Sequence, residues 1–227
     1  MNLNSKQKRA FQTVLSGLNY AKYGKKTIRF LTLTTSALCM ENVDYDDGSI
    51  NKDFQVLKKR IQRYSPYKLY KEGYISKNKM AKIYKHKDYF KKFKFEYFKV
   101  HTNEGNGVLH ILYRGSYLPY NFLVDNWFEI HLSWDINIMQ VDLKNSKSAS
   151  GYIVSQYIGN QNTSYVRSSQ SWSWVYRGFK TDYNDLRAPY DLLNENQRYR
   201  FYTIWNNILQ QKAINTFYPQ MNLTDYG

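Results

Sequence analysis

Cysteine is almost absent from this chain, since Cys39 is the only one among 227 residues. No internal disulfide and no site built from several thiolates can form, which is typical of proteins from a reducing cytosol. No apolar run reaches the ~18 residues that a membrane-spanning helix needs. The N-terminal stretch MNLNSKQKRAFQ lacks the apolar core of a signal peptide, so we expect a cytoplasmic protein. No GxxxxGK[ST] loop occurs, which excludes a fused P-loop motor.

Acidic residues are scarce relative to basic ones. The chain has 33 Lys and Arg against 18 Asp and Glu, a formal net charge of +15. Hydrophobic residues make up 42% of the sequence, enough for a core, so a wholly disordered chain is excluded. A folded protein with this excess of positive charge is expected to bind a polyanion, most often a nucleic acid.

Most of the excess charge lies in one segment, Lys58–Lys99, which holds 15 basic and three acidic residues, a net of +12. One interpretation is a docking surface for phosphates. The alternative is a lysine-rich solvated loop that reflects the base composition of the gene. In the first case the phosphate contacts come from Lys58, Lys59, Arg60, Arg63, Lys91, Lys92 and Lys94.

Hydrophobic spacing predicts alternating helices and strands. Helices are expected at residues 5–20, 50–64, 121–131, 148–158 and 194–217, and strands at 27–34, 93–102, 108–114, 136–143 and 164–167. Without a basic insertion at about 65–92, the order becomes β–α–β–β–α–β. This order predicts an α+β fold of the ferredoxin-like (RRM-like) class, an antiparallel sheet with helices packed on one face, plus N- and C-terminal helices. Several functions share that fold.

A Gly-rich turn between the second and third predicted strands suggests a metal site. If Gly105 and Asn106 are the central turn residues, His101 lies directly opposite His110, with Cβ atoms about 4.5–5.5 Å apart. Two imidazoles so placed, with Glu104 as an oxygen ligand, would suit Mn²⁺ or Mg²⁺. A register slip of one residue separates the pair, which leaves one exposed and one core histidine.

Two further segments could carry function. Tyr152 and Gln156 share one helical face, whereas Tyr157 diverges from Tyr152 by roughly 140°. A tyrosine hydroxyl can attack phosphorus if a metal polarises the phosphate or a base removes the proton; alternatively, both tyrosines are structural. Downstream, an aromatic strip either stacks bases and contacts phosphates or is buried at the sheet edge. Its candidate residues are Arg167, Trp172, Trp174 and Arg177.

The order of these motifs resembles a known family. FLTLT (30–34), EGNGVLHILYRG (104–115), YLPYNFLVDNW, INIMQV, YIVSQYIGNQ (152–161) and SWSWVYRGF (171–179) together resemble rolling-circle replication initiators. These are tyrosine endonucleases of the HUH superfamily, found in archaeal and bacterial plasmids and viruses. The resemblance covers about residues 27–180. It implies a nicking and DNA-binding domain at 25–180, with helical extensions at 1–24 and 181–227.

The resemblance implies a metal-dependent nickase. Tyr152, or else Tyr157, would attack single-stranded or hairpin DNA at a replication origin, and a host helicase and polymerase would follow. His110 would bind the metal, and Arg114 would join the DNA contacts. The chain departs from the family at two positions, with Val108 in place of the first metal histidine and Gln156 in place of a lysine. Either His101 replaces the lost ligand, or the protein binds nucleic acid without cutting it.

Overall fold

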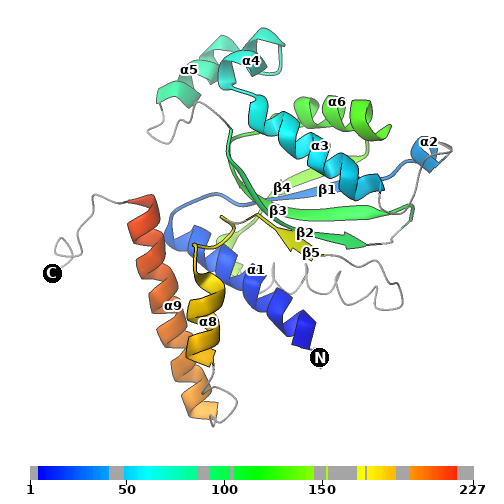
Figure 1. Cartoon of the computed structure of the whole chain (residues 1–227). Coiled ribbons are helices and arrows are strands. Elements are labelled where there is room, and N and C mark those ends of the chain that lie inside the picture. Colours follow the sequence, from blue (N-terminus) through cyan, green and yellow to red (C-terminus); the bar gives the residue numbers. More distant parts are fainter. Residues whose placement is uncertain are drawn as a thin grey trace.

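The computed structural model describes residues 5–40, 49–85, 93–102, 105–145, 152, 168–171, 173–187 and 195–218. Its centre is a five-stranded antiparallel sheet in the order β4-β1-β3-β2-β5, with helices on both faces (Figure 1). The strands are β1 (Arg29–Thr34), β2 (Phe95–Thr102), β3 (Val108–Gly115), β4 (Ile136–Gln140) and β5 (Ser168–Gln170). The predicted α+β class with an antiparallel sheet is therefore confirmed.

One face of the sheet packs against α3 (Ser49–Arg63) and α6 (Tyr120–His131). The apolar residues of α3 recur every three or four positions and are fully buried: Ile50, Phe54, Leu57 and Ile61. They share a core with Leu109, Ile111 and Tyr113, alternate residues of β3 that point to this side. The short helices α2 (Ala37–Met40), α4 (Pro66–Lys71) and α5 (Lys77–Lys85) lie at the ends of this layer.

The opposite face is covered by helices from the two ends of the chain. These are α1 (Ser5–Tyr23), α8 (Phe179–Arg187) and α9 (Glu195–Phe217). Leu18 and Trp205 share a second core with Val100 and Leu112, the strand residues that point to this side. The central strands β2 and β3 therefore bury side chains on both faces. Within the described residues, no helix is long and apolar enough to cross a membrane.

The predicted elements mostly match those observed. The helices predicted at 5–20, 50–64, 121–131 and 194–217 and the first four strands agree with the observed elements to within a few residues. Of the helix predicted at 148–158, the structure describes only Tyr152. The strand predicted at 164–167 lies outside the described residues. The alternative that the basic segment Lys58–Lys99 is a solvated loop is wrong where the structure describes it, because most of these residues lie in helices and in β2. Ser65 caps α4 by accepting a hydrogen bond from the Lys68 amide, and α5 follows.

The predicted register of the β2–β3 hairpin is wrong by one residue. His101 pairs with Leu109, and His110 pairs with Val100. The last paired residues before the turn are Thr102 and Val108, so the five residues between them form the loop. The prediction had a two-residue turn, Gly105 and Asn106, with the residues on either side of it paired. Gly105 and Gly107 both adopt positive φ, 55° and 104°, which other residues rarely do. An odd-length loop puts His101 and His110 on opposite faces of the sheet.

Candidate functional site

His110 lies at the centre of the sheet. Its strand, β3, has β1 on one side and β2 on the other, and His110 pairs with Thr32 and Val100. Since side chains alternate along a strand, His110 shares with Leu112 the face that α1 and α9 cover. Its side chain is buried, at 4% exposure. A central strand fixes the position of this imidazole more rigidly than a loop would.

Tyr152 and Phe30 pack against His110. The Phe30 ring stacks on the imidazole with centroids 5.9 Å apart and an interplanar angle of 20°. Tyr152 lies edge-on to both rings, 5.6 Å from Phe30 and 6.3 Å from His110. Tyr152 is 49% exposed, so one part of its ring contacts the pair and another faces solvent. The sequence analysis predicted His110 and Tyr152 as functional residues from separate motifs, and the structure brings them together. We call Phe30, His110 and Tyr152 the tyrosine–histidine cluster.

The metal site proposed across the hairpin is not formed. His101 lies on the α3 side of the sheet, is 3% exposed, and its Nδ1 is 3.0 Å from Nδ2 of Asn51. The one-residue register shift is the cause. Glu104 lies outside the described residues. Within the described part of the chain, no group of three or more His, Cys, Asp or Glu side chains is placed to bind a metal. Of the two predicted ligands that the structure describes, only His110 lies beside the candidate nucleophile.

The aromatic strip is largely a core element. Trp174 is fully buried, and its Nε1 donates a hydrogen bond to the Thr13 carbonyl at 3.3 Å. The prediction that Trp174 stacks bases is therefore wrong, because α1 covers the indole. Arg177 is exposed and stays a candidate phosphate contact. Arg167, Trp172, Gln156 and Tyr157 lie outside the described residues.

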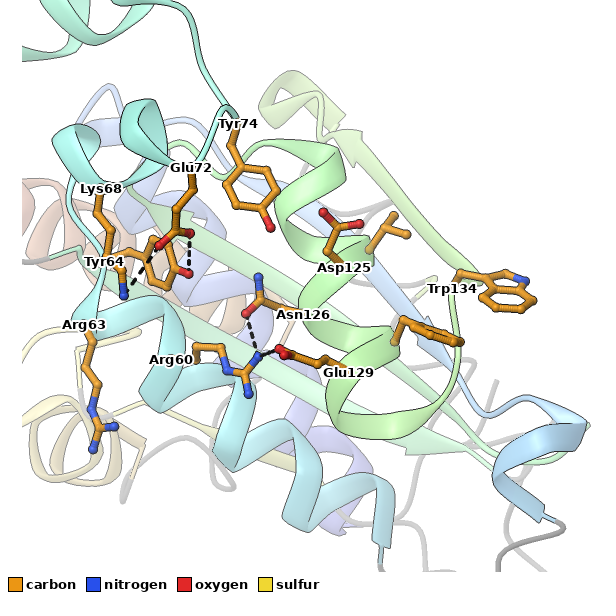
Figure 2. Close-up of a pocket in the computed structure, with 12 residues that line it drawn as sticks. Arg60, Arg63, Tyr64, Lys68, Glu72, Tyr74, Asp125, Asn126, Glu129 and Trp134 are labelled. Atoms are coloured by element: carbon orange, nitrogen blue, oxygen red, sulfur yellow. Dashed lines mark hydrogen bonds and ion pairs between the residues drawn. The ribbon is translucent and has the colours of Figure 1, made fainter.

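A cavity of about 760 Å³ between α3, α4 and α6 contains several residues of the basic segment (Figure 2). Three cations and three carboxylates line it, so their formal charges cancel: Arg60, Arg63, Lys68, Glu72, Asp125 and Glu129. Arg60 donates to Glu129 and, at 3.0 Å, to Asn126 Oδ1, which links α3 to α6. Arg60 is thus an interhelical bridge, and its predicted role as a phosphate contact is not supported.

Two phenols, the buried Tyr64 and the partly buried Tyr74, complete this cavity. Tyr64 donates to Glu72 at 2.7 Å, and desolvation together with that carboxylate raises the pKa of Tyr64 well above 10. Desolvation and the neighbouring Asp125 raise the pKa of Tyr74 to about 12. Both phenols therefore stay neutral at physiological pH and act as hydrogen-bond donors. Neither is suited to act as a nucleophile, and the cavity is a structural junction.

The other predicted phosphate contacts are scattered. Lys59, Arg63 and Lys94 are exposed, Lys58 lies 5.8 Å from the Tyr97 ring, and Lys91 and Lys92 lie outside the described residues. Arg114 is 2% exposed and pairs with Glu96. Sequence reasoning missed Phe30, although the alternation in the strand predicted at 27–34 placed its side chain on the same face as Ile28. It also missed three cations that precede or begin β1, Lys25, Lys26 and Arg29, because they lie outside the conspicuous basic segment.

No protein-family model matches the sequence, and neither a curated protein nor a solved structure is significantly similar to it.

Proposed function

We propose that the chain is a single-strand DNA nicking and joining enzyme that starts rolling-circle replication, with Tyr152 as its nucleophile. The observation that carries this proposal is the tyrosine–histidine cluster, in which Tyr152 lies edge-on to His110. A half-exposed phenol beside an imidazole on a central strand combines an accessible nucleophile with a rigid polar group.

The fold is consistent with this proposal. The β–α–β–β–α–β order and the neighbours β4-β1-β3-β2, all antiparallel, support a ferredoxin-like assignment for the sheet with α3 and α6. Single-strand endonucleases are among the proteins with that order, but the order alone does not select them. The net charge of +15 supports a polyanionic substrate.

The proposed reaction is a transesterification. The Tyr152 oxygen attacks phosphorus, its proton passes to a base or to solvent, and a 5′ phosphotyrosine bond forms. The P–O3′ bond breaks, and the departing oxygen takes up a proton to become the 3′ hydroxyl that primes synthesis. Attack by that hydroxyl on the phosphotyrosine reverses the step and rejoins the strand.

A divalent metal, Mn²⁺ or Mg²⁺, would polarise the scissile phosphate and offset the charge that develops on it. His110 would supply a nitrogen ligand from the described part of the chain. Since His101 lies on the other face of the sheet, it cannot supply a second. Further ligands would have to come from the phosphate, from water or from the segments around Tyr152.

A second function, binding single-stranded nucleic acid without cleavage, is favoured by that same register. The hairpin leaves one imidazole on each face, and Val108 stands where the family has a first metal histidine. This alternative predicts salt-sensitive binding that does not need a metal.

The test uses a 3′-labelled hairpin DNA library with randomised loops, Mn²⁺, and the full chain. A covalent adduct that survives denaturation is expected with the wild type and with Tyr120→Phe, a matched exposed tyrosine on α6. It should disappear in Tyr152→Phe and fall sharply in His110→Gln. An adduct that persists in Tyr152→Phe would exclude this nucleophile. Binding to the library with no adduct in any variant would establish the binding-only function.

A further inference from the structure

A second cavity, of about 600 Å³, lies at the end of the sheet where β1 begins and β3 ends. Figure 1 shows α5 and the C-terminal end of α9 on this same side of the molecule. Five cations and a single carboxylate line the cavity, a net of +4: Lys25, Lys26, Arg29, Lys94, Arg114 and Glu96. The cavity between α3, α4 and α6 is neutral, so the surplus of positive charge distinguishes this one.

Arg114 anchors the cavity. Its side chain is 2% exposed, its Nε donates to Glu96 at 2.5 Å, and one Nη donates to the Ser173 carbonyl. The other terminal nitrogen, Nη1, is buried and has no hydrogen-bond partner among the described residues. A buried charged donor without an acceptor costs free energy, which an incoming anion would recover. A guanidinium held by two fixed acceptors is also oriented before any ligand arrives.

Cations in and beside the cavity lie close to two aromatic rings. Lys26 Nζ lies 5.2 Å from the centroid of the Phe217 ring, and the Arg114 guanidinium lies 5.5 Å from the same ring. At the other side of the cavity, Arg29 lies 5.7 Å and Lys79 4.4 Å from the Tyr117 ring. Each ring attracts its cations, but the cations repel one another. An anion between them would remove that repulsion.

The backbone holds the rim of the cavity in place. Gly115 has φ +129°, and a Cβ at this position would come within 2.1 Å of the Lys94 carbonyl oxygen. The Ser116 amide donates to that same oxygen at 2.9 Å, and Ser116 Oγ accepts from the Lys94 amide at 3.1 Å. Glycine at 115 therefore permits β2 and β3 to close together here, which fixes Lys94 at the cavity edge.

We propose that this sheet-end cavity binds a phosphate group, with Arg114 as the buried anchor and Arg29, Lys26 and Lys94 around it. The site is separate from the tyrosine–histidine cluster. Arg114 follows His110 by four residues on the same strand face, about 13 Å at ~3.3 Å per residue. The phosphate can belong to a nucleic-acid backbone or to a free phosphorylated small molecule, and the experiment separates these sources.

The experiment compares two double variants of the full chain. Arg29→Gln with Lys94→Gln removes two charges from the cavity. Lys52→Gln with Lys180→Gln removes two from exposed positions on α3 and α8 that do not line it. Titration with tripolyphosphate should show at least a tenfold loss of affinity in the cavity variant and less than about a twofold loss in the control. Equal losses in the two variants, or no binding to the wild type, would overturn the proposal.

Displacement of a labelled oligo-dT identifies the source of the phosphate. If tripolyphosphate displaces it, and the log–log salt slope of oligo-dT binding falls by about 1.4 only in the cavity variant, the ligand is a nucleic-acid backbone. If tripolyphosphate binds without displacing it, the ligand is a free phosphorylated molecule. Running both titrations in Tyr152→Phe keeps the result independent of nicking, so either proposal can fail alone.

Arg114→Lys tests the anchor itself. It keeps the charge but loses the guanidinium fork, so tripolyphosphate binding should weaken at least tenfold while the melting temperature shows whether the fold is retained. If this variant does not fold, the double variant Arg29→Gln with Lys94→Gln decides whether the cavity binds phosphate. Unchanged affinity in a folded Arg114→Lys protein would show that Arg114 is purely structural, and would overturn its assignment as the anchor.

Discussion

Gly17 on α1 allows the buried Trp174 to pack close against the helix backbone. A Cβ at position 17 would come within 2.1 Å of Trp174 Nε1, which donates to the Thr13 carbonyl one turn earlier. We therefore expect Gly17→Ala to destabilise the protein by about 1–3 kcal/mol through overpacking, even though alanine favours helices. Urea unfolding measures this change. Lys22→Ala, at an exposed position of α1, should shift the free energy of unfolding by less than about 0.5 kcal/mol.

His131 is a buried histidine whose titration should affect stability. It is 1% exposed, with Nδ1 2.7 Å from Asp53 Oδ2 and Nε2 3.0 Å from Thr35 Oγ1. Desolvation lowers the pKa of His131 below 6.5 and outweighs the opposing effect of Asp53. The neutral ring, donating to Asp53 and accepting from Thr35, therefore predominates in the folded protein at pH 7.

The sign of the pH dependence follows from that lowered pKa. Below pH ~6.5 the unfolded chain takes up a proton at position 131 more readily than the folded one. The contribution of His131 to stability is thus complete above pH ~6.5 and decreases as the pH falls toward the folded-state pKa. Between pH 7.5 and 5.5, the free energy of unfolding should fall more for the wild type than for His131→Gln. Equal falls would contradict the shift.

At the scale of elements, the β2–β3 hairpin separates what the sequence predicts from what it does not. Both strands are predicted to within two residues of their observed bounds. The register depends on the loop, where Gly105 and Gly107 both take positive φ and add one residue to the expected turn. Either glycine is compatible with several turn types, so composition alone cannot fix the loop length. For this reason, the prediction that His101 and His110 bind one metal together was wrong.

The register can be tested with double-mutant cycles in unfolding. His101→Gln and His110→Gln act on opposite faces of the sheet, so their effects should add to within about 0.5 kcal/mol. His110→Gln and Phe30→Leu remove the two partners of a stacked contact, so a coupling of about 0.5–1.5 kcal/mol is expected. Strong coupling between the two histidines, with none between His110 and Phe30, would contradict the observed register.

The residues that predict α4 lie at the start of the helix itself, whereas the burial of the aromatic strip depends on a distant part of the chain. Ser65 as N-cap followed by Pro66 is a typical helix start, although the sequence analysis treated the residues from about 65 onward only as a basic insertion. For Trp174, burial depends on α1, more than 150 residues earlier in the chain. An amphipathic strip has the same sequence pattern whether its aromatic side chains contact a base or a distant helix. Only the assembled fold separates those two cases.

At the scale of the whole molecule, the two ends of the chain close one face of the sheet. The sequence predicted α1 and α9 as helices but treated residues 1–24 and 181–227 as extensions. In the structure, Trp205 of α9 donates to Ser16 of α1 at 3.2 Å, and both helices share a core with strand residues. Single-sequence patterns show which side of a helix is apolar, but they do not show which surface it covers.

Removal of α9 should therefore unfold the protein, or leave it without fixed tertiary packing. Phe201, Trp205 and Leu209 are at most 5% exposed, and burial of each contributes about 1.5–3 kcal/mol. Their combined loss is comparable with the ~5–15 kcal/mol that stabilises a typical domain. A chain ending at residue 194 should lose near-ultraviolet circular dichroism and unfold in urea without a cooperative transition.

Point variants in α9 distinguish loss of packing from loss of chain length. Trp205→Ala should cost about 3–5 kcal/mol, because it leaves a cavity beneath α1 and opposite the sheet. Ile204→Ala, the adjacent position at 51% exposure, is the matched control and should change stability by less than about 0.5 kcal/mol. If the shortened chain keeps the wild-type urea midpoint and Trp205→Ala matches Ile204→Ala, α9 is an appendage. The sheet would then be stable with that face uncovered, which the burial of Phe98, Val100 and Leu112 in the same core argues against.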